Sequence, residues 1–301
     1  MAAVLVFKAS VYYRDLMLSA ELVNQFHQDG YCAITGMLNG GELDALLADL
    51  QSISAEATVA NHDASRMEME PGQQPEGTRV RRLYEPCTHY PRFRALSESG
   101  ELLESVAQLI GENVLFHYSK LNMKPPAIGS AVEWHQDLAY YPLTNSDSLA
   151  VLIYLDDADQ RNGCLQVIPR VHRQGIRLHA SQGYFRGQIT EPVDDSCAAA
   201  VEGSAGTAIF LHGMTPHASA PNTSQHPRRT LILSYRAADA YPIHVGETTL
   251  NAERYVRLVR GEPCSRARLE AVEMPIPRYE TVPKSLYELQ QRFREQQRIV
   301  S

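Results

Sequence analysis

The stretch that decides the fold runs from residue 132 to residue 172 and reads VEWHQDLAYYPLTNSDSLAVLIYLDDADQRNGCLQVIPRVH. It opens with a His-x-Asp pair, His135 and Asp137, and continues into short apolar runs separated by turn residues such as Asn162-Gly163. No long helical pattern interrupts these runs. The pattern therefore argues against a parallel α/β sheet and favours an antiparallel sandwich or jelly roll.

The flanking sequence extends this β-rich region to about residues 113–240 and surrounds it with helical patterns. Further strand-like runs occur at 113–124, 206–213 and 229–239. Apolar residues at helical spacing predict helices at 19–30, 39–56, 94–111, 251–261 and 283–298, and YCAIT predicts a short strand at 31–35. We expect a mainly β fold with flanking helices.

We expect one domain over 1–301, made of three parts. An N-terminal helix-and-strand part covers 19–112, the β core covers 113–240, and a helical extension covers 241–301. Within the first part, residues 56–80 are polar and rich in Pro, Gly and Gln, which predicts a long loop that acts as a lid. The last helix spaces Leu286, Leu289 and Phe293 along one face, which fits packing on the core or on a second subunit, as in a homodimer.

The composition excludes several classes of partner. The net charge is −7 and no long basic run occurs, which argues against a nucleic acid or an anionic membrane as the main partner. The short segment RVRR at 79–82 is interpreted as local ion pairing, and the alternative is a contact with an anionic substrate. Five cysteines without a CxxC pair fit a reducing compartment, and the start of the chain lacks the pattern of a signal peptide. No apolar run reaches the roughly 20 residues of a membrane span, so we expect a cytoplasmic protein.

The tripeptide HQD occurs twice, and geometry separates the two copies. The first, at 27–29, ends a predicted helix, where residues two apart point in nearly opposite directions. The second, at 135–137, lies in an extended region, where residues two apart share a face. We therefore expect His27 and Asp29 to be solvated at a helix end, and His135 and Asp137 to converge on one ion.

A catalytic metal site needs a third ligand, which another strand must supply. The stretch GTAIFLHGMTPHASAPNTSQHPRR, at 206–229, offers His212, His217 and His226. Two histidines and one carboxylate on one face form the facial triad of non-haem Fe(II) oxygenases, which leaves metal positions open for other ligands. A closed set of four ligands would instead indicate structural zinc.

These segments resemble the phytanoyl-CoA dioxygenase family of Fe(II)- and 2-oxoglutarate-dependent oxygenases. The resemblance rests on HxD, on NGxLxxxP, and on HxSxxN followed by a basic pair, and it covers about residues 19–240. It implies a double-stranded β-helix, the jelly-roll core shared with cupins. It also implies that His135, Asp137 and His217 hold iron, which leaves His212 as structural and His226 as a loop residue.

The resemblance also implies residues for the cosubstrate. Arg228 matches the family's arginine for the distal carboxylate of 2-oxoglutarate, and Arg229 is the alternative. Ser219 matches a small hydroxyl residue beside that carboxylate, and Gln136 matches a residue that often lines the pocket. Lys120 is a further candidate cation.

Two other features bear on the pocket. Lys124 shares the strand of Lys120 and is a second candidate cation. PRVH, at 169–172, departs from the PGSH of many relatives, which predicts a changed loop near the pocket mouth.

The implied activity is that of a dioxygenase that uses Fe(II), 2-oxoglutarate and O2. It would oxidise an unactivated C–H bond of a small organic substrate and release succinate and CO2. Because Asp137 is present, hydroxylation, or a desaturation or ring-forming variant, is favoured over halogenation, whose enzymes lack this carboxylate. A natural product, an amino-acid-like metabolite and an acyl-CoA all remain open as substrates. The alternatives are a cupin-type metal enzyme that does not use 2-oxoglutarate, or a non-catalytic binding protein on the same fold.

Overall fold

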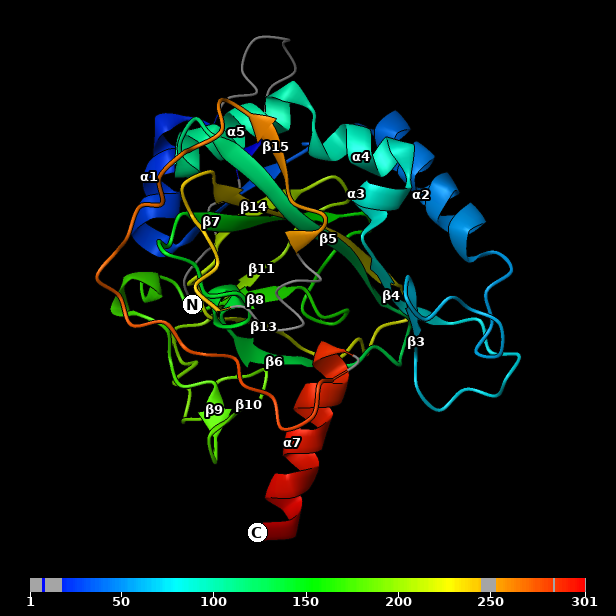
Figure 1. Ribbon diagram of the computed structural model, residues 1–301. Helices are drawn as coiled ribbons and strands as arrows, with labels where there is room; N and C mark the ends of the chain where they lie inside the picture. The colour runs from blue at the N-terminus through cyan, green and yellow to red at the C-terminus, as the bar shows by residue number, and fades with distance from the viewer. Residues whose placement is uncertain (1–6, 9–17, 245–252, 284, 301) are drawn as a thin grey trace.

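Two β-sheets that pack face to face form the centre of the computed structural model, which describes residues 7–8, 18–244, 253–283 and 285–300 (Figure 1). The larger sheet has the strand order β1-β2-β12-β7-β14-β5-β4-β3, and β15 also pairs with β5. Its strands are β1 (Phe7–Lys8), β2 (Tyr31–Thr35), β3 (Met67–Met69), β4 (Val80–Tyr84), β5 (Val114–Lys124), β7 (Ser148–Tyr154), β12 (Ala208–His212), β14 (Arg228–Ala237) and β15 (Arg257–Arg260).

The smaller sheet has the order β11-β8-β13-β6 and is entirely antiparallel. Its strands are β6 (Val132–His135), β8 (Leu165–Val167), β11 (Ala199–Val201) and β13 (His217–Ser219). A hairpin of β9 (Ala180–Ser181) and β10 (Tyr184–Phe185) lies outside both sheets. The predicted jelly-roll core is therefore present.

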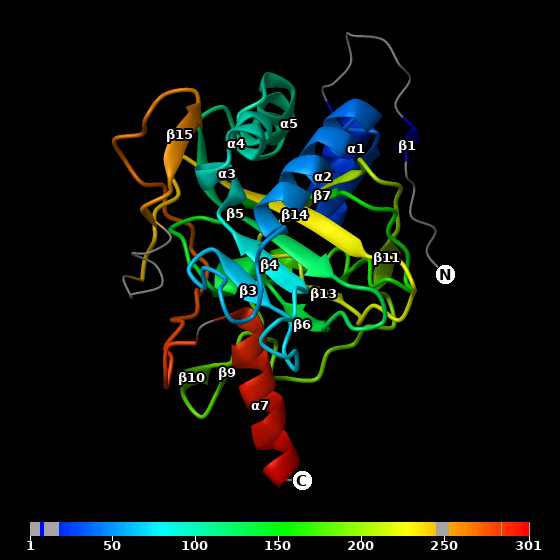
Figure 2. The ribbon, with the colours of Figure 1, turned by 90° about the vertical axis from the view of Figure 1, so that its right-hand side faces the viewer.

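Helices cover the outer face of the larger sheet, as the two ribbon views show (Figures 1 and 2). They are α1 (Ala20–Asp29), α2 (Gly40–Ser54), α3 (Pro86–His89), α4 (Pro91–Ser97) and α5 (Gly100–Ile110). A last helix, α7 (Leu286–Val300), projects from the opposite side. No helix in the described part of the chain is long and apolar enough to cross a membrane.

The alternation of side chains along β7 explains why the sheet is covered on both faces. All seven residues of β7 are buried. Val151 and Ile153 belong to the apolar core beneath the helices, whereas Leu152 and Tyr154 belong to the core between the two sheets. Because successive residues of a strand point to opposite faces, a continuous apolar run is what a strand between two cores requires.

Three predictions of local structure were wrong. Of the helix expected at 251–261, residues 251–252 lie outside the described chain, and residues 257–260 form the strand β15 instead. This strand pairs with β5, and the Arg257 guanidinium lies 4.0 Å from the centre of the Phe116 ring. The segment 56–80 is not one long loop, since β3 lies within it and pairs with β4. The helix expected at 94–111 is interrupted between α4 and α5, where Ser99 adopts an extended conformation and begins the second helix.

Candidate metal centre and adjoining cavities

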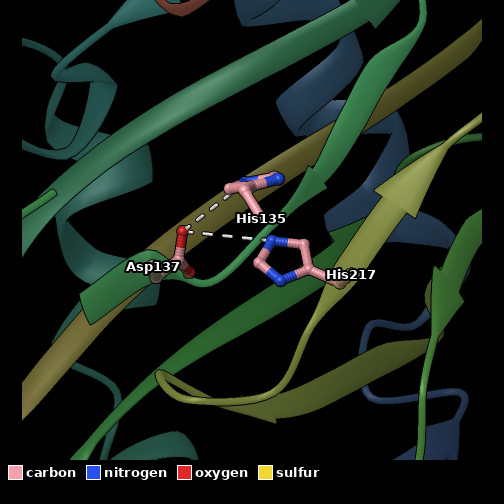
Figure 3. A group of neighbouring side chains, drawn as sticks. All are labelled: His135, Asp137 and His217. Atoms are coloured by element: carbon pink, nitrogen blue, oxygen red, sulfur yellow. Dashed lines mark ion pairs between the residues drawn. The ribbon is translucent and has the colours of Figure 1, made fainter. Parts of the chain in front are cut away.

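Three side chains predicted to bind metal converge between the sheets (Figure 3). His135 ends β6, Asp137 follows two residues later in a short 3-10 turn (Asp137–Ala139), and His217 begins β13. Strands β6 and β13 are antiparallel neighbours in which His135 and His217 are paired across the ladder. The pairing therefore brings together residues that are about 80 positions apart in the sequence.

The ligand atoms of the three side chains all lie within 4.8 Å of one another. Oδ1 of Asp137 is 3.9 Å from Nε2 of each histidine. Nδ1 of His135 lies 2.8 Å from the Glu133 carbonyl oxygen, and Nδ1 of His217 lies 3.0 Å from that of Thr215. Because a carbonyl oxygen only accepts hydrogen bonds, each Nδ1 carries the proton and each Nε2 presents a lone pair to the centre.

Burial keeps both imidazoles neutral. It lowers the pKa of His135 well below its ordinary value, and the neighbouring His217 adds to this effect. Burial also lowers the pKa of His217, against the opposing effect of Asp137. Metal ligands must be unprotonated histidines and ionised carboxylates, so this donor set fits a divalent iron ion bound by two histidines and one carboxylate.

A narrow cavity of about 40 Å³ lies on one side of the triad and contains most of the predicted cosubstrate residues. His135, His217, Ser219, Lys120 and Arg228 all line it. The Arg228 side chain is buried; it donates through Nε and Nη2 to the Gly163 carbonyl oxygen and through Nη1 to Thr230 Oγ1 at 2.7 Å. The narrow cavity is therefore lined both by candidate metal ligands and by the guanidinium of Arg228, which hydrogen bonds hold in place.

Arg229 points to the other face of β14. Its Nε and Nη2 donate to the carboxylate of Asp156 at 2.8 and 2.5 Å. This bidentate ion pair engages Arg229 away from the triad, as the alternation along a strand requires. The geometry thus favours Arg228 over Arg229 as a cosubstrate anchor.

Two other predicted pocket residues have structural contacts instead. The side chain of Gln136 is fully buried, donates to the carbonyl oxygens of Gly175 and Met214, and accepts from the backbone of Arg177. It lines neither cavity beside the triad. Lys124 lines the narrow cavity, but its ammonium group donates to backbone carbonyl oxygens, including that of Ser130 at 2.8 Å. Both residues hold the surrounding loops.

The first HQD copy ends α1, as predicted. Gly30 caps the helix with φ +81°, and His27 is exposed. Asp29, however, is not simply solvated, because its carboxylate accepts from Arg170 Nε at 2.8 Å. The loop around Arg170 therefore contacts the end of α1. Residues 169–172 line neither cavity beside the triad, so the prediction of a changed loop near the pocket mouth was wrong.

A larger cavity of about 540 Å³ opens on the other side of His135 and Asp137. Its lining includes Tyr84, Tyr140, Tyr141 and Arg82, the last from RVRR. It also includes residues that no sequence pattern indicated, namely Glu85, His89, His117, Tyr118, Tyr255 and Tyr279. These residues come from the turn after β4, from β5, from α3 and from the C-terminal segment. No single stretch of sequence carries a pattern for them. Within RVRR, Arg81 pairs with Glu68 at 2.5 Å as expected, whereas Arg82 faces this cavity.

Comparison with known proteins identifies related sequences and folds. The family model for phytanoyl-CoA dioxygenase (PhyH) matches residues 26–230. A probable alpha-ketoglutarate-dependent hypophosphite dioxygenase of Stutzerimonas stutzeri is 31% identical over 231 residues, which are 74% of this chain and 80% of that protein. An ectoine dioxygenase of Bordetella bronchiseptica is 25% identical over 257 residues, 79% of each chain.

Solved structures give the same fold. EctD from S. alaskensis with bound Fe superposes with a TM-score of 0.65 at 24% identity and covers 92% of each chain. The carbocyclase SnoK from nogalamycin biosynthesis gives a TM-score of 0.61 at 23% identity and covers 82% of this chain and 94% of its own. The predicted double-stranded β-helix fold is confirmed.

Proposed function

Because this chain belongs to the phytanoyl-CoA dioxygenase family and is an iron- and 2-oxoglutarate-dependent dioxygenase, we propose that His135, Asp137 and His217 hold its iron. One observation carries this assignment: both histidine Nε2 atoms and the Asp137 carboxylate face one point, and no other described side chain joins this group of potential ligands. Three protein ligands leave coordination positions for the keto acid and for O2.

Arg228 is the proposed anchor for the distal carboxylate of 2-oxoglutarate. Its guanidinium lines the narrow cavity together with His217, and Ser219 lies on the same wall. Lys120 lines both cavities and provides a second positive charge beside the triad. A fixed planar guanidinium binds a carboxylate with defined geometry, which orients the other end of the keto acid toward the metal.

When bound, iron and 2-oxoglutarate supply the oxidising chemistry, in which the keto acid and O2 are converted to succinate and CO2 while a C–H bond of the substrate is oxidised. The residues of this chain perform the positioning. The buried triad fixes the metal, Arg228 orients the cosubstrate, and the walls of the larger cavity hold the substrate beside His135 and Asp137. Hydroxylation is the proposed outcome, because the carboxylate of Asp137 occupies the position that a halide would need.

The substrate is a small molecule, as the names of the relatives indicate for those proteins. The described lining of the larger cavity contains one arginine and one lysine, Arg82 and Lys120. The phosphates of an acyl-CoA would need several cations at the mouth, so we favour a compact metabolite over a CoA thioester. The predicted homodimer remains a prediction; Leu289 and Phe293 of α7 are already buried within this chain.

The two alternative functions have less support. A cupin-type enzyme without 2-oxoglutarate has no use for a buried arginine at the end of the narrow cavity. A non-catalytic binding protein would tolerate the loss of a ligand, and all three candidate ligands are in place.

Substituting the two neighbouring arginines tests the cosubstrate site. We expect Arg228→Lys to raise the Kd for 2-oxoglutarate roughly 10- to 100-fold, because it loses a charge-assisted hydrogen-bond pair of about 1.5–3 kcal/mol. The matched variant Arg229→Lys breaks the bidentate contact to Asp156 and is expected to change this Kd less than about threefold. Calorimetry on the anaerobic Fe(II)-loaded protein measures both values. Equal effects, or a larger effect of Arg229→Lys, would refute the assignment.

A further inference from the structure

The larger cavity is lined by both basic and acidic side chains. Arg82 and Lys120 lie on the neighbouring strands β4 and β5, and Lys120 also lines the narrow cavity. Besides Asp137, the acidic residue in the lining is Glu85, which follows the end of β4. Tyrosines form much of the remaining wall: Tyr84, Tyr118, Tyr140, Tyr141, Tyr255 and Tyr279.

Glu85 is held in a backbone conformation that few residues adopt. Its φ and ψ are 51° and 45°, in the left-handed region, where a residue with a Cβ costs roughly 1–2 kcal/mol. Its backbone N–H donates to the Ser119 carbonyl oxygen at 2.9 Å and turns the chain from β4 into α3. This turn places the carboxylate at the edge of the sheet, in the cavity wall.

The carboxylate of Glu85 has only weak neutral donors. Thr88 Oγ1 donates at 3.2 Å, the Ser119 backbone N–H at 3.3 and 3.4 Å, and the Ser119 hydroxyl at 3.5 Å, so that Oε1 accepts only from the Ser119 N–H. No Lys, Arg or His in the described part of the chain lies within ion-pair distance of it. Since an ionised carboxylate accepts about four hydrogen bonds, it has capacity for a charged donor from a ligand.

Burial raises the pKa of Glu85 to about 7, because the ionised carboxylate is poorly solvated there. Arg257 opposes this shift only weakly, since its guanidinium is engaged by Glu98 at 2.6 Å. A buried carboxyl of this kind is stabilised in its ionised form when a cation arrives next to it.

The two cations of the larger cavity have partners other than Glu85, and for Lys120 this is the Tyr118 hydroxyl, 3.4 Å from its ammonium group. Nε of Arg82 donates to Asn122 Oδ1 at 2.8 Å, and its guanidinium lies 4.9 Å from the centre of the Tyr287 ring. Arg82 itself lines the larger cavity, where its guanidinium also lies 5.8 Å from the centre of the Tyr84 ring, and no ion pair joins it to Glu85 among the described residues. A positively charged group in the larger cavity would be repelled from Arg82 and Lys120 and attracted to Glu85.

We propose that the larger cavity selects a small organic substrate with a cationic nitrogen, and that Glu85 is the specificity-determining residue that binds this nitrogen. The electron-rich faces of the tyrosines favour the same charge, since aromatic rings attract cations by about 0.5–2 kcal/mol. The proposal rests on the proposed function, because this cavity is the substrate site only if iron occupies the triad beside it.

Paired ligands that differ only in charge test this proposal. Choline is compared with its neutral isostere 3,3-dimethylbutan-1-ol, and cyclohexylammonium with cyclohexanol, on full-length anaerobic protein loaded with Fe(II) and 2-oxoglutarate. Calorimetry is expected to show at least tenfold tighter binding of the cation in one or both pairs. Equal or weaker binding of the cation in both pairs would overturn the proposal.

Three variants test whether Glu85 causes the preference for the cationic ligand. Glu85→Gln removes the charge at nearly constant volume and is expected to abolish the preference for the cation, whereas Glu85→Asp keeps part of it. Glu70→Gln is the matched control, because burial raises the pKa of Glu70 as it does that of Glu85, but Glu70 does not line the cavity. A preference for the cation that survives Glu85→Gln would refute the role of Glu85.

Binding of 2-oxoglutarate separates this proposal from the function on which it rests. If wild-type protein binds 2-oxoglutarate but shows no preference for the cation, only the substrate class is wrong. If 2-oxoglutarate does not bind to the iron-loaded protein, the proposed function itself fails.

Discussion

Two hydrogen bonds fix the neutral form of His179, a buried residue behind the triad. Its Nδ1 donates to the Arg177 carbonyl oxygen at 2.7 Å, and its Nε2 accepts from the backbone N–H of Gln136 at 3.1 Å. Burial lowers the pKa of this imidazole to about 4. Protonation would put two N–H groups face to face, so the loop that carries the metal candidates depends on a neutral His179.

This dependence predicts a change in stability with pH. The folded-state pKa of about 4 lies below the ordinary value of 6.5, so the stabilisation is complete above pH 6.5 and is lost as the pH falls from 6.5 to 4. His179→Gln removes this titration. We therefore expect the unfolding free energy of the variant to fall less steeply with decreasing pH than that of wild type, with a difference in slope of up to about 1.4 kcal/mol per pH unit between pH 6.5 and 4. Urea unfolding of the metal-free wild type and variant at several pH values measures these unfolding free energies.

The exposed His226 provides the control for this experiment. His226→Gln should leave the dependence on pH unchanged. If His179→Gln and wild type lose stability in parallel between pH 6.5 and 4, His179 is not the group that titrates.

Sequence reasoning succeeded for residues whose spacing carries the geometry. His135 and Asp137 are two apart at the end of a strand, so their convergence follows from the period of the strand alone. Glu85 and Arg82 carried no comparable signal. Their position in the cavity depends on how β4 pairs with β5 and on a left-handed turn after β4, neither of which is encoded in a local pattern.

At the scale of elements, α7 packs beside the two cavities that adjoin the candidate metal centre. Leu286 lines both cavities, and the Tyr287 ring lies 4.1 Å from the Arg81 guanidinium. Gln290 donates to the Gly187 carbonyl oxygen at 2.6 Å and accepts from the backbone N–H of Glu133 in β6. The helix therefore packs on the core of its own chain, which settles one of the two roles expected for it.

Two glycines with similar backbone conformations test the docking of α7. Gly187 and Gly183 have φ values of +68° and +79°. A Cβ at Gly187 would lie 2.7 Å from Leu289 Cδ2, whereas a Cβ at Gly183 would meet nothing within 4 Å. Both alanine variants bear the backbone cost, but we expect Gly187→Ala to lower the unfolding free energy by about 1–3 kcal/mol more, because of the contact with Leu289.

Urea denaturation of the two variants measures this difference. Adding Leu289→Ala to each variant should reduce the difference in unfolding free energy between them, because alanine removes the contact with the new Cβ at residue 187. The Leu289→Ala substitution itself costs about 2–5 kcal/mol in both backgrounds. Equal destabilisation by Gly187→Ala and Gly183→Ala would mean that α7 does not press against this turn.

Elements were predictable where one stretch of sequence determines them and not where distant pairing does. The apolar run of β7 and the capped α1 followed directly from their patterns. β15 was mistaken for a helix, because its pairing with β5 overrides the helical spacing of its apolar residues. β3 was hidden in a polar segment for the same reason.

At the scale of the whole molecule, the two sheets bring together the candidate iron ligands, the proposed cosubstrate anchor and the larger cavity. The smaller sheet supplies His135 and His217, the larger sheet supplies Arg228 and Lys120, and the space between them holds both cavities. Each functional side chain comes from an inward-facing position of a strand or from the turn that follows one.

The measurement that tests this account most directly is an anaerobic titration of metal-free protein with Fe(II) and then 2-oxoglutarate, followed by the visible absorption band of the iron–keto acid chelate. Wild type, His27→Ala and His226→Ala are predicted to show the band, and His217→Ala is predicted to lack it. A wild-type protein that binds iron without forming the band, or a His217→Ala variant that keeps it, would contradict the account.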